Sequence, residues 1–480
     1  MKLDNRADIK NFIIGIENKF FVNDWKINEN HLWPIIRINL YFYLIAKVEH
    51  EKKKKKVDNI IVLTNHTKKS IKKTFYNLLK FRFLKKIYYN LYCKFWILKT
   101  PNKSNIFVSQ DNHRIDYRNS RFNRFFDPFI EKNKIESDYF YLEYDGLKQE
   151  QRQKYKQENV YNFIKALSFL NIKKTDKYLL SLKNYSEFLS FLLSNETTSD
   201  FAKNWEEKKL EVRAKLFDKK IAYFRKLFKS KNKIKTIYIL CFYSEEVMAL
   251  ISAANQKGVE TIEMQHGPQS DIHMAYSSWT SLPENGYDSL PRKFWNWDNE
   301  SSNTIKNWSS ESNIYSTEVV GNFWVNYWKD KNINYNFRDY IIYSLQTFPY
   351  TIEDFFPPAL INCIVESKRL WFIRLHPRGL SDLDKIKSFL KERNVLKFVN
   401  IENATFDPLP LILQNAFIHV TYFSGTTIEA DMFDVKTVFL SEDGVNTFPN
   451  LLKQKKAFFI PITEKEFQRD FLELIENKDF

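Results

Sequence analysis

Short apolar segments bounded by polar residues recur along the second half of the chain and predict buried strands. They alternate with stretches in which apolar residues recur every three or four positions, the period of an amphipathic helix. The predicted strands are 236–242, 259–264, 340–345, 370–375, 396–400, 416–421 and 437–440, and the predicted helices lie near 244–254, 352–367, 381–393, 408–414, 425–433 and 463–476. Strands that alternate with helices build parallel sheets, so the predicted fold class is α/β.

The first half of the chain is less regular. Three strands are predicted there, at 57–64, 105–109 and 138–143, and residues 1–50 have a helical pattern. Residues 147–235 are charged, helical in period and free of glycine and proline, which indicates a helical insertion. At roughly 150 residues per domain, 480 residues indicate two or three domains.

Composition excludes several classes of protein. The chain has only 9 glycines, and no two of them have the G-x-G spacing of a dinucleotide-binding loop. Its 3 cysteines, Cys93, Cys241 and Cys363, lie far apart, which excludes a disulfide scaffold and a cysteine-rich zinc site. The sequence has neither a long apolar run nor an apolar signal segment, so we expect a cytoplasmic protein.

Positive charge is concentrated at one end. The chain has a net charge of +16, and residues 1–100 contribute 22 Lys and Arg against 8 Asp and Glu, a net of +14. Residues 67–99 combine ten cations with nine aromatic residues and contain no acid. This composition predicts binding to an anionic membrane surface, with a solvated face of the domain core as the alternative. Nucleic-acid binding is disfavoured, because the charge is confined to one segment.

Polar residues that suit a phosphate follow two strands of the second half. Ligands of open α/β sheets bind beyond the carboxyl ends of the strands, so these positions are informative. Arg374-Leu375-His376-Pro377-Arg378 ends one strand and offers two guanidiniums and an imidazole. The segment 424–430 (SGTTIEA) follows another strand and opens a helix with hydroxyl groups and backbone amides, while Glu429 is placed to accept from ribose hydroxyls.

Strand ends in the first half carry candidate acids and bases. Gln265-His266-Gly267 ends one strand, with glycine permitting a tight turn. Asp111 and His113 follow another, and Glu245 and Glu246 follow a third; any of these carboxylates could deprotonate a hydroxyl. Asp382 and Asp384 form a D-x-D pair, but they begin a helix instead of following a strand, so no metal site is predicted.

The motifs in this order resemble bacterial GT-B glycosyltransferases of capsule and lipopolysaccharide assembly, including Kdo and sialic-acid transferases and teichoic-acid-type polymerases. The resemblance covers about 236–445 and rests on four segments: Gln265-His266-Gly267, 319–322 (VVGN), Arg374-Leu375-His376-Pro377 and 424–430. It implies two Rossmann-like domains that face each other across a cleft. Residues 1–325, with the helical insertion at about 147–235, would bind the acceptor, and residues 326–480 would bind the nucleotide sugar.

The resemblance further implies an inverting, metal-independent glycosyltransferase with no resident cofactor. A nucleotide-sugar donor, with a CMP-linked ulosonic acid favoured over UDP- and dTDP-sugars, would supply the sugar for a lipid-linked or polysaccharide acceptor. The residues implied for the donor are Gln265, Gly267, Arg374, His376, Pro377, Arg378, Ser424, Gly425, Thr426, Thr427 and Glu429. Asp111 or Glu246 would be the catalytic base, with His266 and His113 next. The acidic-acidic-glycine motif expected in the first domain is found only at 442–444, so the base stays open.

Four alternatives remain at this point, one of which is an inactive, scaffolding relative of these enzymes. A sugar-nucleotide epimerase or a polyol-phosphate transferase would use the same fold and a similar phosphate site. A non-catalytic nucleic-acid-binding protein would use the basic segment instead.

Overall fold

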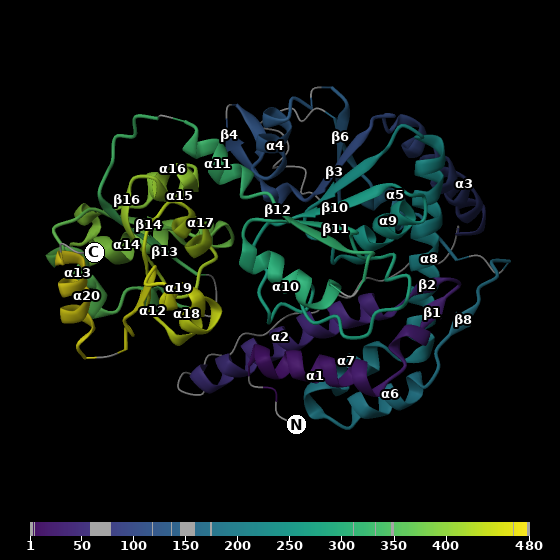
Figure 1. Cartoon of the computed structure of the whole chain (residues 1–480), viewed down its shortest axis with the longest axis horizontal. Coiled ribbons are helices and arrows are strands. Elements are labelled where there is room, and N and C mark those ends of the chain that lie inside the picture. The colour runs from purple at the N-terminus through teal and green to yellow at the C-terminus, as the bar shows by residue number, and fades with distance from the viewer. Residues whose placement is uncertain are drawn as a thin grey trace. The chain divides into compact units, whose positions relative to one another are not determined.

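The computed structural model describes residues 3, 5–57, 78–117, 119–135, 137–144, 159–172, 175–310, 312–331, 333–346, 350–463 and 465–477. The chain forms two compact units, residues 1–322 and 323–480, each with a hydrophobic core of its own. The division predicted from the sequence falls after residue 325. Each unit contains a parallel sheet with helices packed around it (Figure 1).

Within the described residues, the sheet of the first unit has seven parallel strands in the order β12-β11-β10-β9-β3-β6-β7. Their bounds are β3 (Asn105–Ser109), β6 (Tyr139–Glu143), β7 (Val160–Asn162), β9 (Thr236–Ile239), β10 (Glu260–Met264), β11 (Lys293–Asn296) and β12 (Ser316–Val319). The chain runs outward from β3 to β7, returns to β9 beside β3, and runs outward again to β12. This reversal of direction is the topological switch point where doubly wound folds bind ligands.

Helices pack around this sheet, and some of them form a helical lobe of the same unit. They are α1 (Arg6–Lys19), α2 (Trp33–Val57), α3 (Leu78–Lys99), α4 (Phe126–Lys132), α5 (Ile164–Ser168), α6 (Tyr185–Leu193), α7 (Glu196–Asn204), α8 (Glu207–Ser230), α9 (Glu245–Asn255) and α10 (Asn299–Ser309). Helices α1, α2, α6 and α7 lie together in Figure 1, and Phe12 of α1 stacks on Phe191 of α6 with ring centroids 5.7 Å apart. Small antiparallel pairings complete the unit: β1 (Lys26–Ile27) with β2 (Asn30–His31) and β8 (Leu180–Ser181), and β4 (Arg114–Tyr117) with β5 (Ser120–Asn123).

Local chemistry explains where α9 begins and ends, which matters because this helix follows a strand at the switch point. The Ser244 side chain accepts a hydrogen bond from the Val247 amide and so caps the helix. Glu245 and Glu246 complement the helix dipole in the first turn. Beyond the last turn, Gly258 has φ +70°, the left-handed conformation that glycine adopts without strain.

The second unit repeats the same topology with six parallel strands in the order β15-β14-β13-β16-β17-β18. The strands are β13 (Tyr340–Ser344), β14 (Trp371–Arg374), β15 (Val399–Asn400), β16 (Ala416–Thr421), β17 (Thr437–Phe439) and β18 (Ala457–Phe459). The helices are α11 (Phe323–Lys329), α12 (Ile352–Phe355), α13 (Pro358–Glu366), α14 (Leu383–Glu392), α15 (Glu402–Phe406), α16 (Leu409–Leu413), α17 (Thr426–Met432), α18 (Glu442–Thr447), α19 (Pro449–Lys453) and α20 (Phe467–Glu476). Its switch point lies between β13 and β16.

The predicted fold class, α/β with two Rossmann-like domains, is confirmed, and so are most of the predicted strands. The predicted helix at 352–367 is divided into α12 and α13, because Pro357 and Pro358 cannot supply the hydrogen bonds of a continuous helix. The stretch predicted as a helical insertion contains β7, which joins the main sheet through its parallel pairing with β6. Val57 ends α2, and the rest of the strand predicted at 57–64 lies outside the described residues.

Candidate functional site

In the first unit, the carboxyl ends of β3, β9 and β10 meet at the switch point. Parallel pairing puts Val108 beside Ile239, and Glu263 also beside Ile239, so the residues just beyond these positions are neighbours. Cys241 follows β9 and has φ +62°, a backbone conformation that residues other than glycine seldom adopt. Backbone strain of this kind is concentrated at functional sites, so this edge of the sheet is the candidate site of the unit.

Asp111 and His113 lie in a short 3₁₀ turn directly after β3 and are both buried. The Asp111 carboxylate accepts a hydrogen bond from Arg121 Nη2 at 2.8 Å. The Gln110 amide donates to His113 Nδ1, so the neutral ring carries its proton on Nε2. Burial and the neighbouring His266 hold the pKa of His113 well below its usual range. The Asp111 carboxylate is therefore paired with Arg121, and its assignment as the base stays a prediction.

His266 lies beside His113 at the end of β10, with ring centroids 5.7 Å apart. Its Nε2 is 3.5 Å from the Tyr243 hydroxyl, and its Nδ1 is 3.8 Å from Oε1 of Glu263. Glu263 is fully buried within β10 and accepts a hydrogen bond from the Tyr276 hydroxyl at 2.5 Å. Burial raises the pKa of Glu263 to about 8 and lowers the pKa of His266 to about 4. Both side chains are therefore uncharged at neutral pH.

Gln265 and Gly267, the other two residues of the motif, shape the turn that follows β10. The Gln265 amide donates to Gly267 O and Ser301 Oγ and accepts from the Trp297 amide, so its hydrogen bonds join the turn to α10. Gly267 has no left-handed φ, and a Cβ atom there would meet open space. The chain bends at this position, but the bend does not require a left-handed residue. The space beside the Gly267 backbone is open to another molecule.

Glu245 and Glu246, the first-turn acids of α9, share one cation. Lys220 of α8 donates to Glu245 Oε1 at 2.7 Å and to Glu246 Oε1 at 2.8 Å. The two carboxylates raise the pKa of Lys220 against the opposing effect of its burial. Glu246 is thus held in a salt bridge, and its role as a base stays a prediction.

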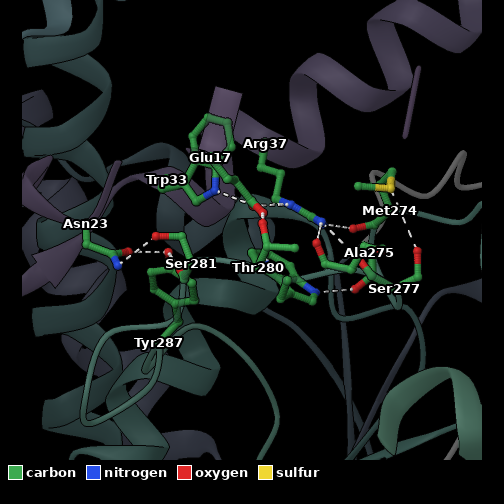
Figure 2. Close-up of polar contacts among 12 residues, drawn as sticks. Glu17, Asn23, Trp33, Arg37, Met274, Ala275, Ser277, Thr280, Ser281 and Tyr287 are labelled. Atoms are coloured by element: carbon green, nitrogen blue, oxygen red, sulfur yellow. Dashed lines mark hydrogen bonds and ion pairs between the residues drawn. The ribbon is translucent and has the colours of Figure 1, made fainter. Parts of the chain in front are cut away.

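A buried ion pair fixes the loop that follows the 265–267 motif (Figure 2). Arg37 of α2 donates through Nε to Glu17 Oε1 of α1 at 2.8 Å, and both side chains are fully buried. The same guanidinium donates to the carbonyls of Met274, Ser277 and Ser278 and lies 4.0 Å from the Trp279 ring centroid. Helices far away in sequence therefore hold the segment 274–280 in place.

In the second unit, hydroxyl groups line the switch point between β13 and β16. Thr421 Oγ1 donates to Ser344 O at 2.9 Å and is 3.3 Å from Gln346 Oε1. Ser344 and Thr427 are buried, and among the described residues their hydroxyl oxygens have no hydrogen-bond partner. Both hydroxyls lie at the end of the sheet where ligands of doubly wound folds bind.

The predicted serine and threonine segment forms the loop between β16 and α17. Ser424 Oγ lies 3.1 Å from Thr426 Oγ1 and accepts from the Thr426 amide. Gly425 precedes the first residue of α17, and Glu429 is half-buried in the first turns of that helix. The structure thus brings these predicted residues together with Ser344, which the sequence analysis did not single out.

His376 begins a 3₁₀ turn, η4 (Pro377–Asp382), directly after β14. Its Nδ1 accepts from the Arg378 backbone amide at 3.1 Å, so a neutral ring carries its proton on Nε2. Arg374 donates through Nη1 to the carbonyls of Ala404 and Asp407, so its guanidinium holds the end of α15. Arg378 is exposed, as is Pro377. The phosphate roles of these four residues stay predictions.

Sequence reasoning missed Glu263 and gave it no role. The strand Glu260–Met264 contains two glutamates, and nothing in the sequence shows that Glu263 is the buried one and Glu260 the exposed one. No group of three or more His, Cys, Asp or Glu side chains suited to a metal ion occurs within the described part of the chain.

No protein-family model and no curated protein matches the chain. Among solved structures, the UDP-GlcNAc 2-epimerase of Methanocaldococcus jannaschii is similar over 78% of this chain and 92% of that chain, with 12% identity and a TM-score of 0.46. The Neisseria meningitidis UDP-GlcNAc 2-epimerase bound to UDP-GlcNAc has 13% identity over 78% and 91%, and a TM-score of 0.45. The Medicago truncatula UGT71G1 complexed with UDP-glucose has 9% identity over 79% and 91%, and a TM-score of 0.39. Because these sequence identities and TM-scores are low, the function has to be argued from the residues of this chain.

Proposed function

We propose that the protein is an inverting, metal-independent glycosyltransferase that moves a sugar from a nucleotide donor to a cell-surface polysaccharide or its lipid-linked precursor. The observation that carries the proposal is the hydroxyl-lined switch point of the second unit, with the buried Ser344 and Thr427 beside the loop of Ser424 and Thr426. Hydroxyl and imidazole donors suit the oxygens of a diphosphate or phosphodiester. The resemblance of the sequence motifs to capsule and lipopolysaccharide transferases supports the same function.

In this proposal the second unit binds the nucleotide of the donor. His376 donates from Nε2 to a phosphate oxygen, and Ser424 and Thr426 donate from their hydroxyls. These donors stabilise the negative charge that grows on the phosphate as the sugar leaves, which is the contribution a divalent ion would make in a metal-dependent enzyme. A CMP-linked ulosonic acid is the favoured donor, followed by UDP- and dTDP-sugars.

The first unit supplies the group that deprotonates the acceptor hydroxyl. Its candidates are the side chains beyond β3, β9 and β10: Asp111, His113, Glu246 and His266. An epimerase on the same fold would need a phosphate site but no acceptor. The products therefore distinguish the two activities.

Nucleotide binding tests the donor site. CMP, UDP, GDP and dTDP are added in turn, and the melting temperature is measured, because a ligand that binds only the native state raises it. At least one nucleotide should stabilise the protein, and His376→Ala should reduce that stabilisation. Lys385→Ala, which removes an exposed lysine at the start of α14, is the matched control and should leave it unchanged. Failure of all four nucleotides to bind would contradict the proposal.

We further propose that α3 holds the enzyme to an anionic membrane. One face of this helix packs into the core of the first unit through Cys93, Trp96 and Ile97. Another carries Tyr88, Leu91, Phe95 and Leu98, spaced three to four residues apart, together with Ile87, and these five side chains are 40% to 71% exposed. An exposed apolar stripe in a basic segment suits the boundary between lipid headgroups and acyl chains. The lysines predicted to assist, at 68, 69, 72 and 73, lie outside the described residues.

Liposome co-sedimentation tests the membrane proposal. Binding should require anionic lipid, weaken at high salt and fall when Leu91, Phe95 and Leu98 are replaced by Ser. Leu179→Ser is the control, since Leu179 is as exposed but lies elsewhere in the unit. The membrane proposal would be contradicted if the protein bound neutral vesicles as well as anionic ones, or if Leu179→Ser reduced binding as much as the α3 substitutions do. Among the described residues, no helix is long and apolar enough to span a bilayer.

A further inference from the structure

Two buried polar side chains meet at the end of β10 without a hydrogen bond between them. The side chain of Glu263 is fully buried, whereas that of His266 is 14% exposed. Of these two side chains, only the imidazole reaches the surface. Oε2 of Glu263 and Nδ1 of His266 make no well-formed hydrogen bond among the described residues, although the backbones of Phe242 and Met264 are close enough to act on the Glu263 and His266 side chains respectively. The distance from His266 Nδ1 to Glu263 Oε1 is 3.8 Å, slightly longer than a hydrogen bond.

The groups around the pair are mostly uncharged. Tyr276 of the following loop, Tyr144 beyond β6, and Cys241 and Tyr243 beyond β9 face Glu263. Burial is the largest effect on Glu263, and it raises the pKa of that carboxyl to about 8, while the Tyr276 hydrogen bond acts in the opposite direction.

The groups that face His266 include one cation. They are Tyr243, His113, His273 and Arg124. Burial lowers the pKa of His266 to about 4, and Arg124 acts in the same direction.

We propose that His266 is the catalytic base of the transfer reaction and that Glu263 is its positioning residue. The inference rests on the proposed transferase function and assigns the base that the sequence leaves open. The other two carboxylates considered for this role, Asp111 and Glu246, are each held by a cation, Arg121 and Lys220 respectively. His266 has no carboxylate hydrogen-bonded to it in this structure, but Oε1 of Glu263 lies 3.8 Å from its Nδ1.

The proton transfer follows from the chemistry of the pair. With Glu263 ionised, its carboxylate accepts from Nδ1–H of His266 once the 3.8 Å gap between them closes, and Nε2, which lies 3.5 Å from the Tyr243 hydroxyl, carries the lone pair. Nε2 takes the proton of the acceptor hydroxyl as the acceptor oxygen bonds to the anomeric carbon. The bond from that carbon to the phosphate oxygen breaks, and its electron pair stays on the departing nucleotide. The Nε2 proton is then lost to water, which returns the ring to the neutral form with its proton on Nδ1, held by the Glu263 carboxylate, before the next turnover.

The protonation state of Glu263 therefore controls the base. When Glu263 holds a proton, it donates to Nδ1, and the ring proton lies on Nε2, where it blocks proton uptake. Activity should rise with pH until Glu263 is ionised, at a pH of about 8, and should be lost as pH falls below that value. A carboxyl with a purely structural role would give no such dependence.

The test is the pH dependence of kcat/KM for nucleotide release, measured from pH 6 to pH 10. The donor is the sugar conjugate of whichever nucleotide among CMP, UDP, GDP and dTDP stabilises the protein most. Glu263→Gln should lose the rise centred near pH 8, and His266→Gln should lower kcat by about 10²- to 10⁴-fold with nucleotide affinity unchanged. Tyr276→Phe, which removes the hydrogen bond to Glu263, should move the rise to higher pH.

Glu260→Gln is the matched control, because Glu260 lies on the same strand but is exposed and paired with Lys293. It should leave the pH profile unchanged. The inference is overturned if His266→Gln keeps wild-type kcat, or if Glu263→Gln and Tyr276→Phe leave the rise where it is. If the variants behave in this way while the wild type is active, the assignment of the base is wrong but the proposed function stands. If the wild type neither binds nor releases a nucleotide, the proposed function itself is refuted.

A readout independent of turnover completes the test. Carbon-13 NMR of the labelled glutamate carboxyls, with Glu263 assigned from the Glu263→Gln spectrum, should show one carboxyl that titrates near pH 8. Its titration should shift in His266→Gln. A Glu263 carboxyl that titrates in the ordinary acidic range, or that ignores the His266 substitution, would overturn the pairing whether or not the enzyme is active.

Discussion

Replacing Arg37 with Met tests whether the buried ion pair organises the loop beyond the 265–267 motif. Methionine has a similar length but no donors and no charge. The substitution removes the salt bridge to Glu17 and the donors for the carbonyls of Met274, Ser277 and Ser278 (Figure 2). Glu17 keeps hydrogen bonds from the Trp33 indole and the Thr280 amide, but its charge stays buried without a cation.

The expected loss of stability follows from these contacts. Breaking a buried pair by removing one partner costs about 3–5 kcal/mol, because an uncompensated charge is left in the core. Each buried carbonyl without a donor costs about 1–3 kcal/mol if no water reaches it. Relaxation of the loop toward water offsets part of this sum, so we expect the free energy of unfolding of the first unit to fall by about 3–5 kcal/mol.

Urea denaturation followed by circular dichroism measures this change. The double variant Glu17→Gln with Arg37→Met should be more stable than Arg37→Met alone, since the amide keeps the acceptor for Trp33 and removes the buried charge. Lys10→Met, which breaks an ion pair with the exposed Asp271, should cost less than about 1 kcal/mol. An Arg37→Met protein within about 1 kcal/mol of the wild type would refute the reasoning, because surface pairs already lie in that range.

Three further predictions concern the chemistry and stability of the chain. Transfer should survive EDTA, and loss of activity restored by Mg²⁺ or Mn²⁺ would bring Asp382 and Asp384 back as metal ligands. Gly444→Ala should lower the melting temperature, since a Cβ there would lie 2.5 Å from the Tyr422 carbonyl oxygen; an unchanged value would show that α18 moves freely. Stability should fall as pH drops from about 6.5 toward 4, because burial lowers the pKa of His419 to about 3 and the unfolded chain binds that proton more readily. His419→Gln should flatten this part of the stability curve, and an equally steep curve would assign the loss to other groups.

The repeating pattern of strands and helices was enough to predict the fold class, because each αβ pair is a local signal. Strand 105–109 has an apolar centre between polar residues, and strand 260–264 lies between Lys257-Gly258 and Gln265-His266-Gly267; the sequence predicts both, the second as 259–264. The strand 160–162 could not be predicted, because it is three half-buried residues in a charged stretch and exists through its pairing with β6. Pairing between distant segments has no local signature.

The candidate sites divide in the same way. His266 and the loop 424–427 are found from sequence, because polar residues that follow a strand lie at the binding edge of a parallel sheet. Arg37 reads in the sequence only as a break in an apolar run, since its partners lie at 17 and at 274–278. Glu263 reads as part of a strand. Its importance follows from full burial beside a histidine, which only the structure provides.

Product analysis after incubation with a nucleotide sugar tests the proposed function most directly. The enzyme is mixed with each donor and with a polysaccharide acceptor preparation, and the nucleotides and sugars are separated by anion exchange and examined by NMR. We expect free nucleotide to accumulate together with a new glycosidic bond whose anomeric configuration is inverted relative to the donor. Recovery of the nucleotide sugar as its epimer, with no free nucleotide and no new bond, would contradict glycosyl transfer and assign the chain to the epimerases.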